Sequence, residues 1–181
     1  MRTPCPTHLC APSVIRGDRA AGACFDASRV YRYRLWRDWH VPPRSSRRLL
    51  WILLNPSTAD EAILDPTIRR CVRFSREWGY TGLEVVNLFA LRATDPASLR
   101  LAADPVGPGN DEAIAAALGD CRAAVAGWGA HPLAASRAAV VRDMARAFRT
   151  PLFCLGVTKS GQPRHPLYLR AETRRQRVAE P

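Results

Sequence analysis

The fold is decided by the stretch Leu49-Leu50-Trp51-Ile52-Leu53-Leu54, which Asn55-Pro56-Ser57 follows at once. The apolar run is too short for a helix of ordinary length, and no turn residue interrupts it. Such a run is typical of a strand buried on both faces, as in a parallel sheet. Ligands of open α/β sheets bind just beyond the carboxyl ends of the strands, so Asn55 is the first candidate site residue.

Helix and strand patterns alternate along the rest of the chain. Asp65-Pro66 is typical of a helix start, with Asp as the N-cap and Pro in the first turn, and Gly79 is a stop signal. Further strands are predicted over residues 83–88, 123–128 and 151–155, and further helices over 110–118 and 133–148. Because this alternation indicates βαβ units, we predict a three-layer α/β/α sandwich around a central, mainly parallel four-stranded sheet.

The N-terminal part follows a different pattern. Residues 30–39 alternate between apolar and basic side chains, which predicts a half-buried strand at the edge of the sheet. Residues 1–22 contain several Pro and Gly and little periodicity. We therefore divide the chain into a loose basic arm over 1–22, a single α/β domain over 23–170 and a basic tail over 171–181.

Positive charge is concentrated at the two ends of the chain. Of the net charge of +11, residues 1–48 hold +7 and residues 159–181 hold +4, while residues 49–158 are balanced. This distribution indicates contact with phosphate, although a protein with merely basic tails would look the same. The candidate phosphate-binding residues are Arg69, Arg70, Arg164 and Arg170. For Arg69 and Arg70 the alternative is an ordinary solvated helix face.

The cysteines and the hydropathy profile limit the cellular setting. Cys5, Cys10 and Cys24 could bind a metal or an iron–sulfur cluster together with His8, but their spacing matches no specific pattern. No apolar run approaches the length of a membrane span, and no secretory signal is recognisable. We therefore expect a cytoplasmic monomer with reduced thiols, no membrane partner, no metal and no cofactor.

Polar or glycine-rich residues follow every predicted strand. These segments are Asn55-Pro56-Ser57-Thr58, Asn87-Leu88-Phe89-Ala90, Trp128-Gly129-Ala130-His131 and Arg164-His165-Pro166-Leu167-Tyr168-Leu169. Each alone has an ordinary structural interpretation, such as an Asx turn or an amide satisfied by the backbone. In a parallel sheet, however, all of them face one edge. Two Asn amides, an imidazole and aromatic rings would then line a pocket suited to a planar base, because an Asn amide offers a donor and an acceptor together.

The chain resembles the domain-of-unknown-function family 1643 over about residues 25–170. The resemblance is carried by the blocks LLNPSTAD, DPTIRRC, VVNLFALRATDP, PVGPGND, AGWG and HPLYL. That family implies no activity. More distantly, the chain resembles the uracil-DNA glycosylase superfamily, especially its mismatch-specific branch. Asn55-Pro56-Ser57 is similar to the Asn-Pro-Gly loop of that superfamily, residues 87–94 to its second motif, and residues 165–169 to its late His-Pro loop.

The glycosylase resemblance implies a hydrolase that cleaves the N-glycosidic bond of a base in a nucleotide or in nucleic acid, DNA rather than RNA. Asn55 would position the attacking water, and His165 would donate a hydrogen bond to the developing charge on the base. Asn87 would read the base edge, and Phe89 or Trp128 would stack on the base.

The loop residues Leu167 and Tyr168 would wedge into the base stack while the target nucleotide is flipped out. Two features depart from the glycosylase pattern: Ser57 replaces a glycine, and Asp60, Glu61 and Asp65 place acids beside the site. The acids could bind a metal or act as a general base, or they are solvated loop residues. The alternative function is a non-catalytic nucleic-acid or nucleotide-binding module on the same fold, and another enzyme that uses the acids is a third reading.

Overall fold

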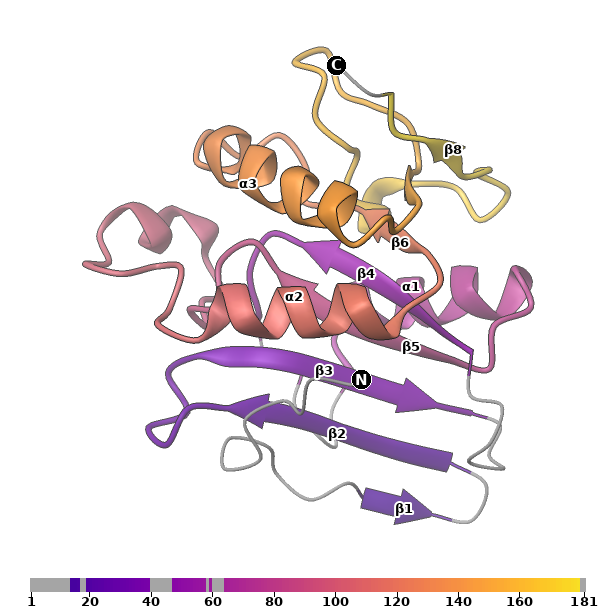
Figure 1. Ribbon diagram of the computed structural model, residues 1–181, viewed down its shortest axis with the longest axis horizontal. Coiled ribbons are helices and arrows are strands. Elements are labelled where there is room, and N and C mark those ends of the chain that lie inside the picture. Colours follow the sequence, from indigo (N-terminus) through magenta and orange to yellow (C-terminus); the bar gives the residue numbers. More distant parts are fainter. Residues whose placement is uncertain (1–13, 17–18, 40–46, 58, 60–63, 180–181) are drawn as a thin grey trace.

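The computed structural model describes residues 14–16, 19–39, 47–57, 59 and 64–179. Within these residues the chain forms one eight-stranded sheet with the order β1-β2-β3-β5-β4-β6-β7-β8 (Figure 1). The strands are β1 (Val14–Arg16), β2 (Arg19–Phe25), β3 (Arg32–Asp38), β4 (Arg48–Leu53), β5 (Gly82–Asn87), β6 (Ala124–Ala126), β7 (Leu152–Cys154) and β8 (Gln176–Arg177). The helices are α1 (Pro66–Glu77), α2 (Asn110–Asp120) and α3 (Ala134–Ala147), with 3-10 turns η1 (Pro96–Arg100) and η2 (Pro166–Tyr168). None of the helices in the described ranges combines the length and the apolar character needed to cross a bilayer.

Strand β4 lies inside the sheet and is covered on both faces. It pairs in parallel with β5 on one side and with β6 on the other, and β6 continues in parallel with β7. Its residues 49–53 are all buried. The prediction of a doubly covered strand from the run 49–54 is therefore confirmed.

The two faces of β4 contribute to two hydrophobic cores. Trp51 packs with Phe74 of α1 on one face, whereas Leu50 and Ile52 pack with Ile114 of α2 on the other. Helices α2 and α3 lie on one side of the sheet, and α1 lies behind it (Figure 1). The mixed α/β class is confirmed, while the specific likeness to a glycosylase sandwich stays a prediction.

Helix α1 begins and ends where the sequence signals lie. The Asp65 side chain accepts a hydrogen bond from the backbone N–H of Ile68 at 2.8 Å, and Pro66 occupies the first turn. Gly79 follows the helix with a φ of +75°, a conformation that glycine adopts without strain. These local contacts fix where α1 begins and where it ends.

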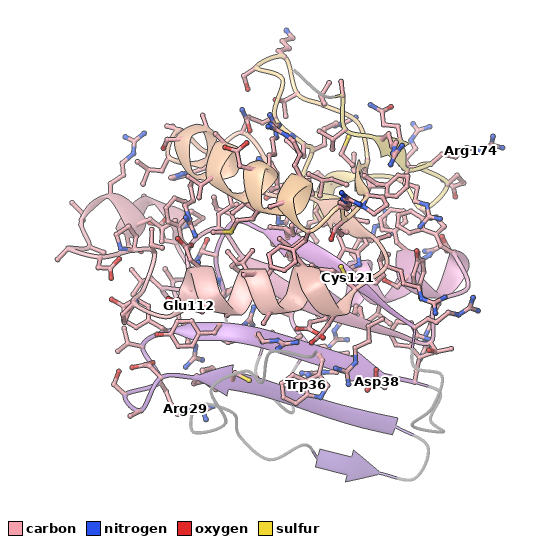
Figure 2. All side chains as sticks on the ribbon, viewed as in Figure 1. Arg29, Trp36, Asp38, Glu112, Cys121 and Arg174 are labelled. Carbon is pink, nitrogen blue, oxygen red and sulfur yellow. The ribbon has the colours of Figure 1, made fainter. Side chains whose placement is uncertain are left out.

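The predicted edge position of residues 30–39 is wrong, because β3 lies between β2 and β5. Its basic side chains looked like a solvent face, but several are buried: Arg32 is within the protein, and Arg34 forms an ion pair with Glu84 of β5. Asp38, labelled with Trp36 on β3 in Figure 2, accepts two hydrogen bonds from Arg48 at 2.5 and 2.8 Å. Ion pairs with residues of neighbouring strands allow these charged side chains to be buried.

Two segments expected to lie outside the domain contribute strands to the sheet. Within the predicted arm, Val14–Arg16 and the first part of Arg19–Phe25 pair as antiparallel strands, and residues 1–13 lie outside the described residues. A Cβ at Gly22 would overlap the Trp36 ring, so this small residue lets β2 and β3 pack closely. Within the predicted tail, Gln176–Arg177 pair with β7. Strands as short as β1 and β8, with three and two residues, carry no periodic apolar signal.

Candidate functional site

A cavity of about 640 Å³ lies at the carboxyl ends of β4, β5 and β6. This volume falls in the range of small-molecule sites. Among the residues predicted for the site, seven line the cavity: Asn55, Asn87, Trp128, Arg164, His165, Leu167 and Tyr168. The structure therefore brings together groups that are up to 113 positions apart in the sequence, because parallel strands end at the same edge.

Asn87 is the last residue of β5 and is 1% exposed. Its Oδ1 accepts a hydrogen bond from Nη2 of Arg32 at 3.2 Å. A guanidinium has donors only, so this contact fixes which end of the amide faces Arg32. Among the described residues, nothing accepts a hydrogen bond from the amide nitrogen Nδ2. Asn87 thus presents a buried, unsatisfied donor at the cavity, and such groups are rare in native proteins.

Buried polar side chains hold the end of β5 in place. Nη1 of Arg32 donates to the carbonyl of Ala59 at 2.7 Å. Asn110, at the start of α2, donates from Nδ2 to the carbonyls of Asn87 and Leu88, both at 3.1 Å. Nε of Arg137 in α3 donates to the same Leu88 carbonyl at 2.9 Å. Residues of β3, α2 and α3 thus hold the end of β5, and with it the Asn87 side chain, in place.

Asn55 follows β4 and ties two loops together. Its Nδ2 donates to the carbonyl of Ala93 at 2.8 Å and to that of Pro56 at 3.0 Å, and the Ala93 N–H donates back to the Pro56 carbonyl at 2.9 Å. These contacts use the amide nitrogen. The amide oxygen is then the part of Asn55 that can accept a hydrogen bond from a bound water.

His165 is the N-cap of η2, where its Nδ1 accepts a hydrogen bond from the N–H of Leu167 at 3.4 Å. Burial lowers the pKa of His165, and the charge of Asp65 opposes this effect in part. The imidazole is therefore neutral at pH 7, and because Nδ1 accepts, the proton resides on Nε2. His165 can donate that N–H to a ligand.

The loop that carries His165 forms the exposed rim of the cavity. Leu167 is 36% exposed and Tyr168 is 79% exposed. The Tyr168 ring lies 5.6 Å from the His165 ring, measured between centroids. Two exposed apolar side chains beside a cavity mouth are available for contact with a ligand or partner.

The two candidate stacking residues differ in their access to the cavity. Phe89 does not line it, because its side chain lies in the core formed by the sheet, α2 and α3. Trp128 lines the cavity but is only 1% exposed, and its indole N–H donates to Oε1 of Gln162 at 2.9 Å. Trp128 therefore offers little ring surface to a ligand.

Only one of the four candidate phosphate-binding arginines lines the cavity, and that residue is Arg164. Arg70 instead donates to the backbone carbonyl of Leu169 and so attaches the end of the η2 loop to α1. Arg69 and Arg170 are exposed at other positions on the surface. The structure gives Arg70 a positioning role that its exposed-face pattern did not indicate.

Two ionisable residues complete the wall of the cavity. His131 follows β6, and its Nδ1 accepts from the N–H of Leu133 at 3.3 Å; burial lowers the pKa of His131, and Arg100 lowers it further. Its position after a strand end was the signal that could have placed it in the site. Asp65 also lines the cavity while it caps α1.

The acids and cysteines that the sequence suggested as metal ligands are only partly described. Asp60, Glu61, Cys5, Cys10 and His8 lie outside the described residues. Cys24 is buried beside Tyr33 and is disulfide-bonded, so the expectation of reduced thiols is wrong for this residue. In the part of the chain that the structure describes, no three His, Cys, Asp or Glu side chains gather as a metal-binding group.

The fold and the cavity define a mixed α/β protein with a polar pocket at the carboxyl ends of its parallel strands. A family model matches residues 32–167, and the chain belongs to that family, which is described as protein of unknown function (DUF1643). The match includes every residue that lines the cavity except Tyr168. Comparisons with curated proteins and with solved structures gave no match. The resemblance to uracil-DNA glycosylases therefore depends on the sequence motifs alone.

Proposed function

We propose that the cavity binds a nucleobase and that the protein hydrolyses the N-glycosidic bond of that base in a nucleotide or in DNA. The observation that carries the proposal is the convergence of Asn55, Asn87 and His165 on one cavity. The three side chains come from different parts of the chain and offer complementary groups: an acceptor for water, a donor for the base and a donor for developing negative charge. The three-layer arrangement expected of a glycosylase-like protein is compatible with helices on both sides of the sheet.

The contacts of Asn87 restrict which base would bind. Arg32 already donates to Oδ1, so Nδ2 is the atom of this amide that has no partner among the described residues. A donor on the protein requires an acceptor on the base, such as a carbonyl oxygen or an unprotonated ring nitrogen. An exocyclic amino group at that place would put two donors against each other. We therefore propose a base that presents a carbonyl oxygen or an unprotonated ring nitrogen to Nδ2, with no amino group at that place.

In the proposed reaction, the C1′–N bond breaks and its electron pair leaves with the base. Nε2–H of His165 stabilises the negative charge that develops on the departing base. A water held by Oδ1 of Asn55 attacks C1′, the sugar gains the hydroxyl, and the remaining proton ends on the free base. An amide is a very weak base, so Asn55 would contribute by positioning the water rather than by taking its proton.

The rim of the cavity suggests how a nucleotide in a strand would be reached. Tyr168 and Leu167 would fill the gap left in the stack when the base is flipped out, a role suited to exposed apolar residues. Arg164, beside them at the rim, would contact a flanking phosphate.

A base-release assay tests this proposal. Purified protein is incubated with single- and double-stranded oligonucleotides and with free nucleotides that carry different bases, and released base is measured by chromatography. We expect Asn55→Ala and His165→Ala each to reduce release by about 100-fold or more, with affinity for the substrate nearly unchanged. Arg73→Gln, on the exposed face of α1, is the control. Release that both site variants leave intact would contradict the assignment.

The second candidate is a binding module without catalysis. It is favoured by the weak basicity of the site, since Asp65 is the only carboxylate among the described lining residues and already caps α1. This reading predicts that wild-type protein binds nucleotides or oligonucleotides without releasing any base. In that case Asn87→Ala would reduce affinity, and no substitution would alter the yield of free base.

A further inference from the structure

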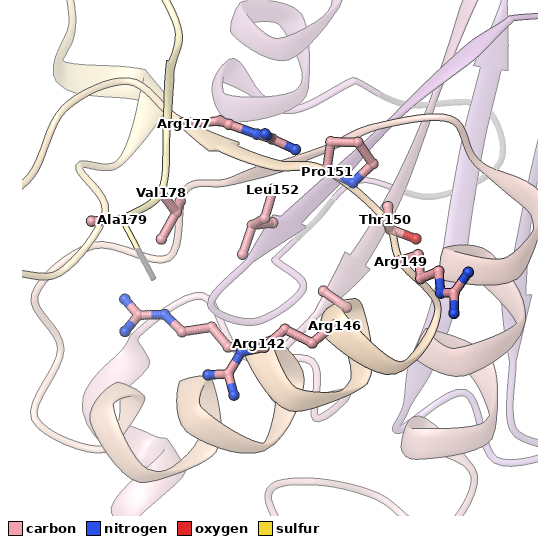
Figure 3. Close-up of a pocket in the computed structure, with 10 residues that line it drawn as sticks. Arg142, Arg146, Arg149, Thr150, Pro151, Leu152, Arg177, Val178 and Ala179 are labelled. Atoms are coloured by element: carbon pink, nitrogen blue, oxygen red, sulfur yellow. The ribbon is translucent and has the colours of Figure 1, made fainter. Parts of the chain in front are cut away.

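A second cavity, of about 670 Å³, lies away from the first, where α3 ends and β7 begins. It is bounded by the C-terminal half of α3, by residues 150–152 and by β8 with the residues after it (Figure 3). The two cavities share no lining residue. A ligand in the second cavity would therefore not use the side chains assigned to the base.

Four arginines line the second cavity. Arg142, Arg146 and Arg149 come from α3 and its C-terminal end, and Arg177 comes from β8 and extends over the cavity from the other side (Figure 3). Arg146 forms an ion pair with Asp143 at 2.8 Å. Within the described ranges, no carboxylate lies within ion-pair distance of the other three guanidinium groups. Among the described residues, three of the four arginines of the cavity therefore have no carboxylate partner.

The surroundings of Arg142 also suit an anionic ligand. Its guanidinium lies 5.7 Å from the centroid of the Trp128 ring, a cation–π contact that holds the side chain in place. Its Nε is buried, and no acceptor for it is found among the described residues. A buried donor on a charged group is costly to leave unsatisfied, and an anionic oxygen in the cavity would satisfy it.

Arg149 occupies a backbone position that favours glycine. Its φ of +53° is in the left-handed region, and it directly follows the C-cap residue of α3. The helix dipole favours a cation near this end, which is an ordinary reason for Arg146 and in part for Arg149. The dipole does not require a side chain at the glycine-type position, and it does not explain Arg177, which belongs to a different element.

We propose that the second cavity binds a ligand with two or more phosphoryl groups, either a free oligophosphate or adjacent phosphates of a nucleic-acid backbone. Guanidinium groups match phosphate oxygens in geometry and charge. Their number and their placement on two facing elements suit a ligand that carries more than one phosphate. The proposal does not rest on the proposed function, since none of the arginines that would contact the phosphates lines the first cavity.

Binding measurements on the full chain test the proposal. Inorganic triphosphate and a single-stranded oligonucleotide are titrated into the protein at low salt by calorimetry. We expect the double substitution Arg142→Gln with Arg177→Gln to weaken binding of at least one probe by tenfold or more. For the oligonucleotide, the slope of log K against log salt should become shallower by about 0.7 for each phosphate that the variant no longer neutralises.

A matched pair of variants separates a ligand-binding role from a structural one. Arg149→Gly relieves the left-handed backbone, so we expect a higher melting temperature, by about 2–4 °C, together with weaker binding. Arg73→Gln removes the same charge from α1, which packs on the opposite face of the sheet, and should bind as the wild type does.

The outcomes are distinct. Loss confined to the oligonucleotide identifies backbone phosphates as the ligand, and loss that includes triphosphate identifies an oligophosphate site; both support the proposal. A wild-type protein that binds neither probe overturns the proposal. It is also overturned if the site variants bind both probes as tightly as Arg73→Gln does. Asn87→Ala should leave triphosphate affinity unchanged, so failure of the nucleobase proposal would not be mistaken for failure of this one.

Discussion

Replacing Asn87 by Asp changes one atom of the side chain and separates recognition from stability. In the wild type, Oδ1 accepts from Arg32 at 3.2 Å, while Nδ2 is buried without an acceptor among the described residues. An unsatisfied buried donor costs about 1–3 kcal/mol. Asn87→Asp keeps the acceptor for Arg32 and replaces the unsatisfied nitrogen by an oxygen.

The expected effect on stability follows from these contacts. The Arg32 guanidinium already donates to Oδ1, and a carboxylate there would turn this charge-to-amide hydrogen bond into an ion pair. That gain opposes the cost of burying a carboxylate, whose second oxygen takes the unpartnered place of Nδ2. We therefore expect the free energy of unfolding at pH 7 to change by no more than about 1–3 kcal/mol. The arginine lowers the pKa of the new carboxyl, so its contribution is present at neutral pH and is lost as acidification protonates the group.

The expected effect on ligand binding is a clear loss of affinity. The substitution removes the only amide donor that Asn87 offers to a ligand, and loss of about 1–3 kcal/mol corresponds to a roughly 5- to 150-fold weaker affinity. Urea denaturation measures the stability, and calorimetry with uridine, guanosine, adenosine and cytidine 5′-monophosphates measures the affinity. An Asp variant that is stable and still binds a carbonyl-bearing base as tightly as the wild type would refute the reasoning.

Two further predictions concern pH and close packing. Burial lowers the pKa of His165, so the folded protein resists protonation, and stability that is complete above pH 6.5 should decrease as the pH falls below that value. His165→Asn keeps an acceptor for the cap of η2 but cannot be protonated in this pH range. The difference in unfolding free energy between pH 7.5 and 5.5 should therefore become smaller, while the part that His131 contributes remains. An unaltered difference would exclude His165 as its source. Gly82→Ala should lose about 1–3 kcal/mol, because a Cβ there would overlap Asp38 and lie 2.9 Å from a backbone oxygen of β3. Gly119→Ala, in an exposed turn of α2 with only ordinary contacts, should instead gain about 0.5–1 kcal/mol, and equal urea midpoints for the two alanine variants would contradict the packing argument.

Local signals in the sequence were sufficient for the centre of the fold. The run 49–54 has no polar position, so no reading other than a buried segment fits it, and the Asp65-Pro66 cap depends only on neighbouring residues. The position of β3 could not be predicted in the same way. Arg34 and Asp38 look solvated until their partners Glu84 and Arg48 are placed beside them, and those partners come from other strands.

The candidate site was predictable to the extent that strand ends define it. The rule that ligands bind at the carboxyl ends of parallel strands placed Asn55, Asn87 and His165 correctly around one cavity. It could not find Arg32 or Asn110, whose importance lies in hydrogen bonds to the end of β5 that only the tertiary structure creates. For the same reason it gave no indication that Phe89 lies in the core.

The proposed recognition of a base and the proposed catalysis make different demands on this cavity. Recognition needs a fixed donor, and Asn87 is held by Arg32 and Asn110 before any ligand arrives, so little ordering remains to be done on binding. Catalysis needs stabilisation of a leaving base and a placed nucleophile. Asn55 can supply only placement, for which about 7–11 kcal/mol of barrier lowering is the upper range in well-oriented reactions. The remaining stabilisation would have to come from the N–H of His165, so the chemistry depends most on the residue whose neutral state burial maintains.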